Sequence, residues 1–473
     1  MATALNTEAA CRNACWPAHS KVVFPGSDAF TNATIRWNAY GGPSYCAAVS
    51  PGSEEEVASV VTVATAAGIP FLATGGRHNF GTTVQKLQNG LAIDLSRLNK
   101  VTVHKDSATV TIGGGAKIRD VVAPVAAAGF QIPSGACNCA GYIGSGIGGG
   151  IGYLEGTFGL VIDSLVSARV VTAKGDLIDV SAKSNPDLFW AIRGAGTNFG
   201  IITSAVYKLH KPVNSGKVFY ADLVYSAGQK TDYFNAMQKY NNNMPSQLGF
   251  SGAFFWDANT NQTSILSTLI YVGTEEEARA KLAPFFDLNP VVVDARMIPF
   301  TEIPSVVLMG VTDASCSALE SLQAIHTVNV RKFDADTYVS VFDKFDAFLK
   351  KYPDSRASAI ILETFSNDAA LAVPDDATAY PWRDARGNFM LQMRWTGLDN
   401  PFGKTANEFA VELRDDIVAT SGYPDLSAYV SYAYGDETPE QKFGKDKLPR
   451  LLQLKKKWDP KNVFRYCNPL PSK

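Results

Sequence analysis

Hydrophobic positions in the first half of the chain alternate between helical and strand spacing, which predicts a series of α/β units. Ser53-Glu-Glu-Glu56 is typical of a capping box, so a helix is expected over 57–67 and a short buried strand over 69–73. A later helix begins with Pro186 in its first turn, and another ends at Gly129. Further strands are predicted over 91–95, 101–104, 108–112, 160–163, 167–179 (a hairpin) and 201–209.

The pattern changes near Pro212, where glycine turns become rare. Amphipathic helices are predicted over 275–286, 335–352 and 405–421, between strands over 218–225, 250–256, 265–272, 359–365 and 389–395. This alternation is typical of a second α+β domain. A last helix is expected over 447–457. We therefore expect an α+β protein with an N-terminal arm (1–44), a first domain (45–212), a second domain (213–425) and a C-terminal segment (426–473).

The stretch GACNCAGYIGSGIGGGIG, from Gly135 to Gly152, contains eight glycines. Each glycine in an ordered element costs roughly 0.5–1 kcal/mol in chain entropy, so the stretch forgoes about 4–8 kcal/mol. A flexible linker would be polar, whereas this stretch carries isoleucines inside a domain. The sequence therefore indicates backbone that approaches an anion or a flat ring closely.

Two shorter glycine turns accompany this stretch. Thr74-Gly-Gly-Arg-His-Asn79 directly follows a predicted strand, and Arg193-Gly-Ala-Gly-Thr-Asn-Phe-Gly200 follows a predicted helix. The end of a strand is where α/β proteins present backbone N–H groups to phosphates, and Arg77 would add charge-assisted hydrogen bonds. These turns predict a phosphate-containing ligand.

Composition and charge exclude several partner classes. The chain of 473 residues has 43 Lys and Arg against 45 Asp and Glu, which leaves no basic footprint for nucleic acid or an anionic membrane. No stretch approaches the ~18–20 apolar residues of a membrane helix, and no secretory signal is visible. We therefore lean towards a cytoplasmic protein, with a secreted mature form left open.

The seven cysteines are too scattered for a disulfide scaffold or a zinc site, so no metal is expected. Cys11, Cys15 and Cys46 could support one disulfide if the protein were exported. Separately, Gly144-x-Gly146-x-x-Gly149 satisfies a dinucleotide fingerprint, but no strand precedes it and more glycines follow it. A nicotinamide-dependent reductase therefore stays an alternative only.

Five motifs in order resemble one family. They are TGGRHN, PSGAC-x(3)-G-x-x-G-x(3)-GGG-x-G, FGLVIDSL-x(4)-VVTAKGD, NPDLFWAIRGAGTNFGI and WDPKNVF. Together they resemble the FAD-linked oxidases of the vanillyl-alcohol oxidase superfamily, in the berberine-bridge-enzyme-like branch, and their wording is similar to fungal secondary-metabolism members. The resemblance implies a two-subdomain FAD-binding domain (45–212), a substrate domain over the flavin, and a C-terminal segment that returns to the FAD domain.

The resemblance also assigns cofactor residues. His78 would bond the flavin 8α-methyl, and Cys137, with Cys139 as its competitor, would bond C6. The pyrophosphate loop would be formed by Thr74, Gly75, Gly76, Arg77 and Asn79. The cofactor would be lined by Gly141, Gly144, Ser145, Gly148, Gly149 and Gly150, with Gly194–Gly200 and Ile201 at its adenine side or ring edge.

A base is needed to remove the substrate's proton as hydride leaves. Tyr429-Val-Ser-Tyr432 occupies the place of a Tyr-x-Asn-Tyr segment of the family. If this segment is a strand, only one of Tyr429 and Tyr432 can face the flavin, and we expect Tyr429. Gln392 and Arg394 share a strand face that could meet a polar substrate, and Glu363 is similarly placed.

The predicted function is an FAD-dependent oxidoreductase. It would move a hydride from a small alcohol, amine or phenolic metabolite to flavin N5, with reoxidation by O2. The alternatives are an oligosaccharide oxidase of the same fold, a nicotinamide-dependent reductase and an inactive flavin-binding scaffold. The substrate and the oligomeric state stay open.

Overall fold

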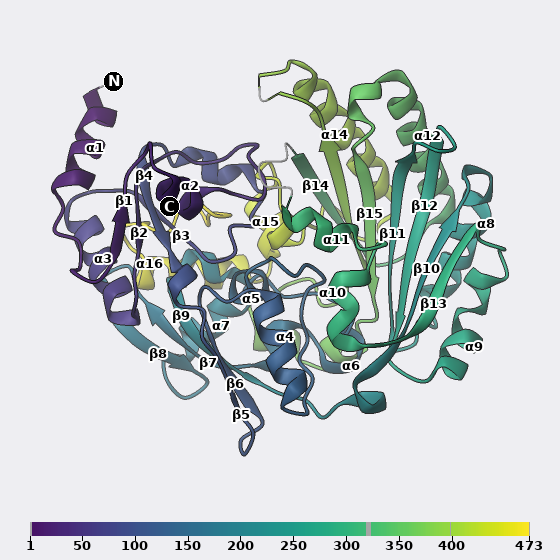
Figure 1. Cartoon of the computed structure of the whole chain (residues 1–473), viewed down its shortest axis with the longest axis horizontal. Helices are drawn as coiled ribbons and strands as arrows, with labels where there is room; N and C mark the ends of the chain where they lie inside the picture. Colours follow the sequence, from purple (N-terminus) through teal and green to yellow (C-terminus); the bar gives the residue numbers. More distant parts are fainter. Residues whose placement is uncertain (1, 318–322, 398, 473) are drawn as a thin grey trace.

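In the part of the chain that the structure describes, the strands form three sheets, two in one half of the molecule and one in the other (Figure 1). The computed structural model describes residues 2–317, 323–397 and 399–472. In that part of the chain no helix is both long and apolar enough to cross a membrane.

The first sheet is built around a parallel crossover. Its strand order is β1 (Lys21–Val23), β2 (Tyr45–Ser50), β4 (Gly90–Asp94) and β3 (Phe71–Thr74), with β2 and β3 both parallel to β4. Helix α3 (Glu54–Ala66) connects β2 to β3, and the Ser53 hydroxyl accepts a hydrogen bond from the Glu56 N–H at 3.2 Å. The predicted cap is confirmed, and the helix begins three residues earlier than expected.

The N-terminal arm adds helices α1 (Ala2–Asn13) and α2 (Asp28–Thr34) to this sheet. A disulfide between Cys11 and Cys46 ties α1 to β2. Helix α1 was not expected, because its hydrophobic positions are too sparse to define a face.

The second sheet is antiparallel and has the order β5 (Val101–His104), β6 (Thr109–Gly113), β9 (Ile201–Lys208), β7 (Leu165–Val171) and β8 (Leu177–Ser181). Helices α4 (Ile118–Ala127) and α7 (Pro186–Ala195) accompany it. Both predicted hairpins are confirmed. The strand predicted over 160–163 is wrong, because Val161–Ser164 form a 3₁₀ turn in which the Asp163 carboxylate accepts the Leu160 N–H at 3.0 Å.

The third sheet is antiparallel and fills the other half of the molecule (Figure 1). Its order is β13 (Val292–Pro299), β10 (Lys217–Tyr225), β12 (Gln262–Tyr271), β11 (Leu248–Asp257), β15 (Ala359–Phe365), β16 (Gly387–Arg394) and β14 (Gln323–Val330). One face packs against helices α8 (Lys230–Gln238), α9 (Glu275–Phe286), α12 (Ala335–Lys351) and α14 (Phe402–Thr420). The opposite face is turned towards the other half.

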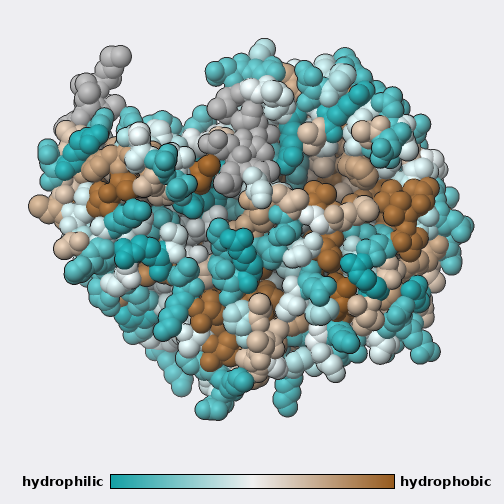
Figure 2. Space-filling view, in the orientation of Figure 1, coloured by the Kyte–Doolittle hydropathy of each residue, from teal (hydrophilic) through white to brown (hydrophobic). Residues whose placement is uncertain are grey.

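The hydrophobic pattern missed β13, β14 and α8. All eight residues of β14 are buried, so polar and apolar positions do not alternate. Strand β13 lies at the sheet edge, where Val291, Val292 and Val293 are exposed. Figure 2 shows hydrophobic areas on this side of an otherwise mostly hydrophilic surface. Continuous burial removes the hydrophobic period in β14, and in β13 only Ile298 is buried, so its pattern is weak.

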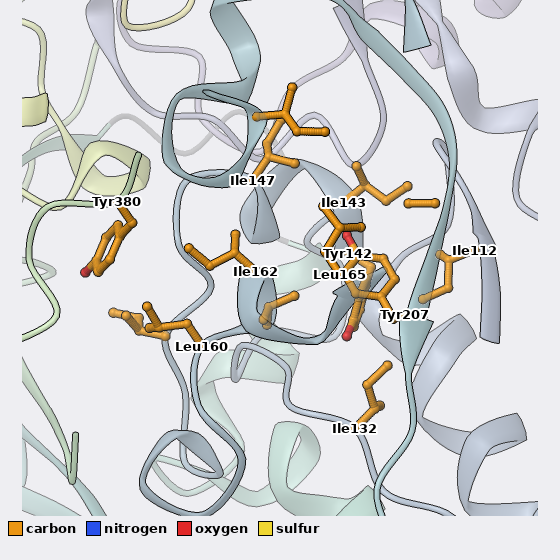
Figure 3. Packing of buried hydrophobic residues seen from close by; sticks show 14 of the residues in the cluster. Ile112, Ile132, Tyr142, Ile143, Ile147, Leu160, Ile162, Leu165, Tyr207 and Tyr380 are labelled. Carbon is orange, nitrogen blue, oxygen red and sulfur yellow. The ribbon is translucent and has the colours of Figure 1, made fainter. Parts of the chain in front are cut away.

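The glycine stretch, residues 135–152, contributes several side chains to a hydrophobic core cluster. It contains the short helix α5 (Tyr142–Gly146) and is followed by α6 (Glu155–Phe158). Its isoleucines are buried, and Figure 3 shows Ile143 beside Tyr142 and Tyr207, whose rings meet edge to face at 5.2 Å. One side of the stretch is therefore core, which leaves the other side free to form a wall.

The C-terminal segment packs against the first half. It contains the turn Val430–Tyr432 and helices α15 (Pro439–Phe443) and α16 (Leu448–Trp458), of which α16 contacts α7. The Asn198 amide donates to the Asn468 carbonyl at 3.1 Å, and the Asn198 oxygen accepts the Leu470 N–H at 2.8 Å. Residues at the end of the chain are thus fixed beside the third glycine turn.

Candidate active site

A cavity of about 420 Å³ lies between the glycine turns and the open face of the seven-stranded sheet. Its walls come from segments that are far apart in the sequence. Most residues that the sequence marked for the site line it, and the exceptions are Cys139, Gly149, Asn198 and Phe199. The lining residues include Thr74, Gly75, Gly76, Arg77, His78, Asn79, Cys137, Gly141, Gly144, Ser145, Gly148, Gly150, Ile201, Gln392, Tyr429 and Tyr432.

His78 lies in the turn that follows β3, directly after Arg77, whose φ of 55° is in the left-handed region. The Trp37 ring stacks on the imidazole with the centroids 4.3 Å apart and an angle of 18°. Burial lowers the pKa of His78 to about 4. The imidazole is therefore neutral at neutral pH, and a ring nitrogen has a lone pair available for a covalent bond.

Cys137 is the free thiol beside this imidazole. Its Sγ lies 3.4 Å from His78 Nε2 and 3.5 Å from Cys139 Sγ. Cys139 is bonded to Cys316 in a disulfide, which the sequence did not predict. Only Cys137 of the Cys-x-Cys pair can therefore be attached to a ligand. The same disulfide removes one of the three ligand atoms that a metal ion could use at this point.

The pyrophosphate turn differs in one respect from the expectation. One guanidinium nitrogen of Arg77 donates to the Asn32 carbonyl at 2.7 Å and lies 3.8 Å from the Asp94 carboxylate. The Arg36 side chain, which the sequence did not mark, lines the cavity and donates to the Asn79 carbonyl. No local sequence signal pointed to Arg36, because it lies in the arm without periodicity.

Several glycines lie where no side chain would fit. A Cβ on Gly76 would collide with the Gly141 backbone, and one on Gly148 would collide with the Ser431 hydroxyl. A Cβ on Gly144 would meet nothing within 4 Å, so this position faces open space on the cavity side. The turns therefore pack against each other and leave a smooth backbone wall.

Gly149 was expected to line the cofactor, but in the structure it packs against two tyrosine rings. Its φ is 137°, and a Cβ there would meet the Tyr380 ring at 2.7 Å. The residue is a packing position between Tyr380 and Tyr429, and it does not line the cavity. The fingerprint to which it belongs also lacks a preceding strand, because residues 133–141 contain none.

The two C-terminal tyrosines both line the cavity, which corrects the expectation that only one could face it. The segment is a 3₁₀ turn and not a strand, and the rings lie 4.8 Å apart, edge to face. The Tyr429 hydroxyl accepts the Gly150 N–H at 3.0 Å. The Tyr432 hydroxyl donates to the Glu363 carboxylate at 2.8 Å.

Glu363 lies on β15, on the face of the sheet turned to the cavity. Burial raises the pKa of its carboxyl to about 7, and the hydrogen bond from Tyr432 opposes that shift. Burial also raises the pKa of Tyr432 well above the usual value. The pair can therefore hold one proton between two oxygens near neutral pH.

The expected strand face on β16 is confirmed, since Gln392 and Arg394 both line the cavity. They do not reach the Tyr432–Glu363 pair. Glu363 is opposite Asn388 in the sheet, so Gln392 is four residues further along, at roughly 13 Å. Between them, Ile361, Met390 and Ile325 give an apolar lining.

Two family models match the chain. One, described as an FAD binding domain, matches residues 46–181, and one described as berberine and berberine like matches residues 428–471. The FAD-linked oxidoreductase srdI of Neurospora crassa is 45% identical over 95% of this chain and 89% of that protein. The FAD-linked oxidoreductase OXR1 of Pyricularia oryzae is 43% identical over 96% and 89%. The chain belongs to the berberine-bridge-enzyme-like FAD-linked oxidoreductases.

The fold agrees with this membership. A solved glucooligosaccharide oxidase from Acremonium strictum, described as carrying a 6-S-cysteinyl, 8α-N1-histidyl FAD, superposes with a TM-score of 0.85 at 20% identity over 99% of each chain. The two-domain α+β architecture that the motifs predicted is confirmed. The expectation that the protein is an FAD-linked oxidoreductase is confirmed as well.

The cavity of this oxidoreductase fits FAD. The Thr74 hydroxyl is buried, lines the cavity and has no hydrogen-bond partner among the described residues, so it is suited to donate to a phosphate oxygen. The glycine turns offer backbone N–H groups and a flat wall. Residues 464–468 of the C-terminal tail complete the lining, and the first of them, Phe464, is the last residue of the WDPKNVF motif.

Proposed function

We propose that this oxidoreductase oxidises a small, mainly apolar metabolite at an alcohol, amine or phenol group, with an FAD attached through His78 and Cys137 and reoxidised by O2. The observation that carries the proposal is the Tyr432–Glu363 hydrogen bond of 2.8 Å at the cavity wall. When FAD is bound, its N5 is the hydride acceptor. The protein then needs only to hold the substrate and take its proton.

The covalent attachment is supported by the placement of two side chains. His78 is neutral and held by Trp37, and the free Cys137 thiol lies 3.4 Å from it. The Acremonium strictum enzyme carries its FAD on one histidine and one cysteine, which is the same pair of residue types. Burial raises the pKa of Cys137, so attachment at the thiol would be the slower of the two.

The proton acceptor is the Tyr432–Glu363 pair. The substrate O–H or N–H donates to the Tyr432 oxygen while the Tyr432 proton moves to the Glu363 carboxylate. Because the pKa of Tyr432 is far above neutral, a free phenolate does not form, and the transfer needs Glu363 in its ionised state. Tyr429 is bound to the Gly150 N–H and supports the wall.

The lining favours an apolar substrate body over a sugar chain. The cavity lining includes the apolar side chains Ile361, Ile325, Met390, Val307 and Leu308. Ser251, the polar neighbour of Glu363 in the sheet, is hydrogen-bonded to Tyr153 at 2.8 Å. Oligosaccharide oxidation is the alternative because the similar fold of the Acremonium strictum enzyme serves it. A sugar would bury hydroxyl groups against these side chains without partners, which costs free energy.

The cofactor proposal is tested on the purified protein. We expect a yellow protein whose colour stays in the pellet after acid precipitation. His78→Ala and Cys137→Ala should each lower the covalently bound fraction, and the double variant should release all flavin into the supernatant. Colour that is released from the unmodified protein by acid would contradict covalent attachment, while a colourless protein would contradict the cofactor site itself.

The activity proposal is tested by H2O2 release over a panel of primary alcohols, amines, phenols and oligosaccharides. We expect H2O2 with at least one apolar alcohol, amine or phenol and a higher kcat/KM for it than for any sugar. Preference for an oligosaccharide would overturn the substrate class. Flavin reduction without H2O2 would show that O2 is not the acceptor.

A further inference from the structure

Residues 303–317, which we name the strap, follow β13 in the chain. The strap consists of helix α10 (Ile303–Val306), a turn, helix α11 (Val311–Ala314) and the 3₁₀ turn Ser315–Ser317. In Figure 1, α10 and α11 lie between the two halves of the molecule. Five of its residues line the cavity: Val307, Leu308, Val311, Thr312 and Ser315. The strap is therefore one wall of the substrate space.

The sheet side of the strap is fixed by a buried carboxylate. Asp222 on β10 is fully buried and accepts the Met309 N–H at 2.6 Å and the Tyr220 hydroxyl at 2.7 Å. The Thr268 hydroxyl donates to the same carboxylate and accepts the Leu308 N–H at 2.8 Å. Two consecutive backbone groups of the strap are thus bound to the sheet.

These hydrogen bonds hold a turn that would otherwise be unfavourable. Leu308 and Met309 both have φ of 54°, and Gly310 follows with φ of 76°. The left-handed region costs a residue with a side chain roughly 1–2 kcal/mol. The turn buries Leu308, which is 8% exposed, and leaves Met309, which is 54% exposed, on the surface. The strained geometry therefore has the effect of directing the Leu308 side chain inwards.

The other side of the strap is bound to three residues of the half that contains the glycine turns, namely Cys139, Asn138 and Trp37. The Cys139–Cys316 disulfide is covalent and spans 177 residues of sequence. The Asn138 amide donates to Ser305 Oγ at 3.0 Å and to the Asp313 carboxylate at 2.8 Å. The Trp37 indole N–H, beside His78, donates to the Ser315 carbonyl at 2.9 Å. The strap is thus tied to both halves.

The sheet register gives the backbone separation between Glu363 and Thr268, the residue to which the Leu308 N–H is hydrogen-bonded. Glu363 on β15 is opposite Ser251 on β11, and Ser251 is opposite Thr268 on β12, to which Leu308 is bound. Two strand spacings separate Glu363 from Thr268, which is roughly 10 Å. The Leu308 side chain packs with Val224, Ala253, Leu266 and Ile361. It therefore closes the cavity about one ring plus a short substituent away from the reacting group.

We propose that Leu308 is a specificity-determining residue that limits how far the apolar end of the substrate extends from the Tyr432–Glu363 pair, and that the Cys139–Cys316 disulfide keeps the strap in this position. The substrate class is a compact alcohol, amine or phenol with one ring. This inference deepens the proposed function and rests on it.

The test uses the holoenzyme and benzyl alcohols with para-alkyl chains of increasing length. The wild-type kcat/KM should fall at least tenfold beyond a short chain. Leu308→Ala should move this limit to longer chains by at least two carbons, mainly through KM. Met309→Ala is the matched control, since Met309 is the neighbour with the same φ but does not line the cavity. An unchanged limit in Leu308→Ala overturns the inference.

A binding measurement separates this inference from the proposed function. The Kd of the same series is followed by the change in the flavin spectrum in a Glu363→Gln variant. If no member of the series is oxidised but the Kd series shows the same limit, shifted in Leu308→Ala, the proposed function fails and the size limit stands. If the Kd values show no limit, the size limit fails even where oxidation is observed.

The role of the disulfide is tested in the Cys139→Ala/Cys316→Ala double variant, which leaves Cys137 without a neighbouring free thiol. We expect the shortest substrate to be oxidised at a rate within a few-fold of wild type and the preference for short over long chains to fall at least fivefold. Flavin content reports whether the variant is folded. A folded variant with the wild-type chain-length profile would remove the disulfide from the proposal.

Discussion

The Glu363 carboxyl shows how burial changes the acid–base properties of a single residue. An exposed glutamate would be ionised at all physiological pH values, but this one is buried under the Tyr432 hydroxyl, and its pKa is raised to about 7. A carboxyl with this pKa can both accept and return a proton near neutral pH. Trp37 and burial have the corresponding effect on His78, whose imidazole is kept neutral.

The first prediction at this scale compares the two tyrosines. Tyr432→Phe removes the group that takes the substrate proton, so kcat/KM should fall by about 10²–10⁴-fold. Tyr429→Phe removes the acceptor of the Gly150 N–H and keeps the ring, and its effect should be less than about tenfold. Steady-state H2O2 release on one substrate measures both. A larger loss in Tyr429→Phe would identify Tyr429 as the base.

The second prediction concerns pH. Because Glu363 must be ionised, kcat/KM should be constant above its pKa and should fall about tenfold per pH unit below about 7. Glu363→Gln should lower kcat/KM and abolish this acidic limb, since glutamine does not titrate. The effect of pH on stability has the opposite sign. Because the pKa of Glu363 is higher in the folded protein than in the unfolded chain, its contribution to the free energy of unfolding is fully present below the pKa of the unfolded chain. This contribution is lost as the pH rises through about 7. A limb that persists in Glu363→Gln would belong to another group.

At the scale of elements, the glycine stretch combines two requirements that its sequence does not separate. Gly149 and Gly150 have positive φ and pack against Tyr380, Tyr429 and Val161, whereas Gly144 faces open space on the cavity side. The first kind of glycine is needed for the fold and the second for the ligand. The isoleucines of the stretch are buried in the core, and this burial determines which glycines face the core and which face the cavity.

The third prediction is a matched pair in this element. Gly149→Ala should lower the free energy of unfolding by about 2 kcal/mol or more, because the backbone is strained for alanine and the Cβ meets Tyr380. Gly144→Ala should leave the stability of the apoprotein within about 0.5 kcal/mol, since alanine suits a helix, and should reduce flavin content. Thermal melting of the apoprotein and flavin absorbance measure the two effects. Equal destabilisation by both variants would contradict the distinction.

Among the elements, those with a clear local signal were predicted. The Ser53 cap, the hairpins of the second sheet and the helices α9, α12 and α14 follow from nearby residues, and their limits are close to those expected. Strand β14 and the Tyr429–Tyr432 turn were not, because β14 is buried on both faces and the turn depends on contacts with β15 and the glycine stretch.

At the scale of the whole molecule, a buried ion pair connects the two halves. Arg383, beyond β15, binds Asp163, beside the glycine stretch, through two hydrogen bonds of 2.7 and 3.0 Å, and both side chains are almost fully buried. Arg383 also donates to the Ala370 carbonyl at 3.0 Å and the Thr378 hydroxyl at 2.8 Å. This ion pair holds the seven-stranded sheet at a fixed distance from the half of the molecule that contains the glycine turns.

The fourth prediction follows from this ion pair. Arg383→Ala should cost about 3–5 kcal/mol in the free energy of unfolding, because Asp163 would be left buried without its partner. Arg12→Ala breaks the exposed pair with Glu8 and should cost less than about 1 kcal/mol. Denaturant titration of both variants tests the difference. A loss below 1 kcal/mol for Arg383→Ala would show that the two halves dock independently of this pair.

The sequence by itself determined the family, the cofactor class and the residues of the glycine turns, because these depend on short motifs whose backbone conformation and spacing are local. The tertiary structure decided which distant groups lie beside these turns. Tyr432 and Glu363 are 69 residues apart, and Cys139 and Cys316 are 177 apart. Their contacts depend on strand register and on the docking of two halves, and no residue near them in the chain carries that information.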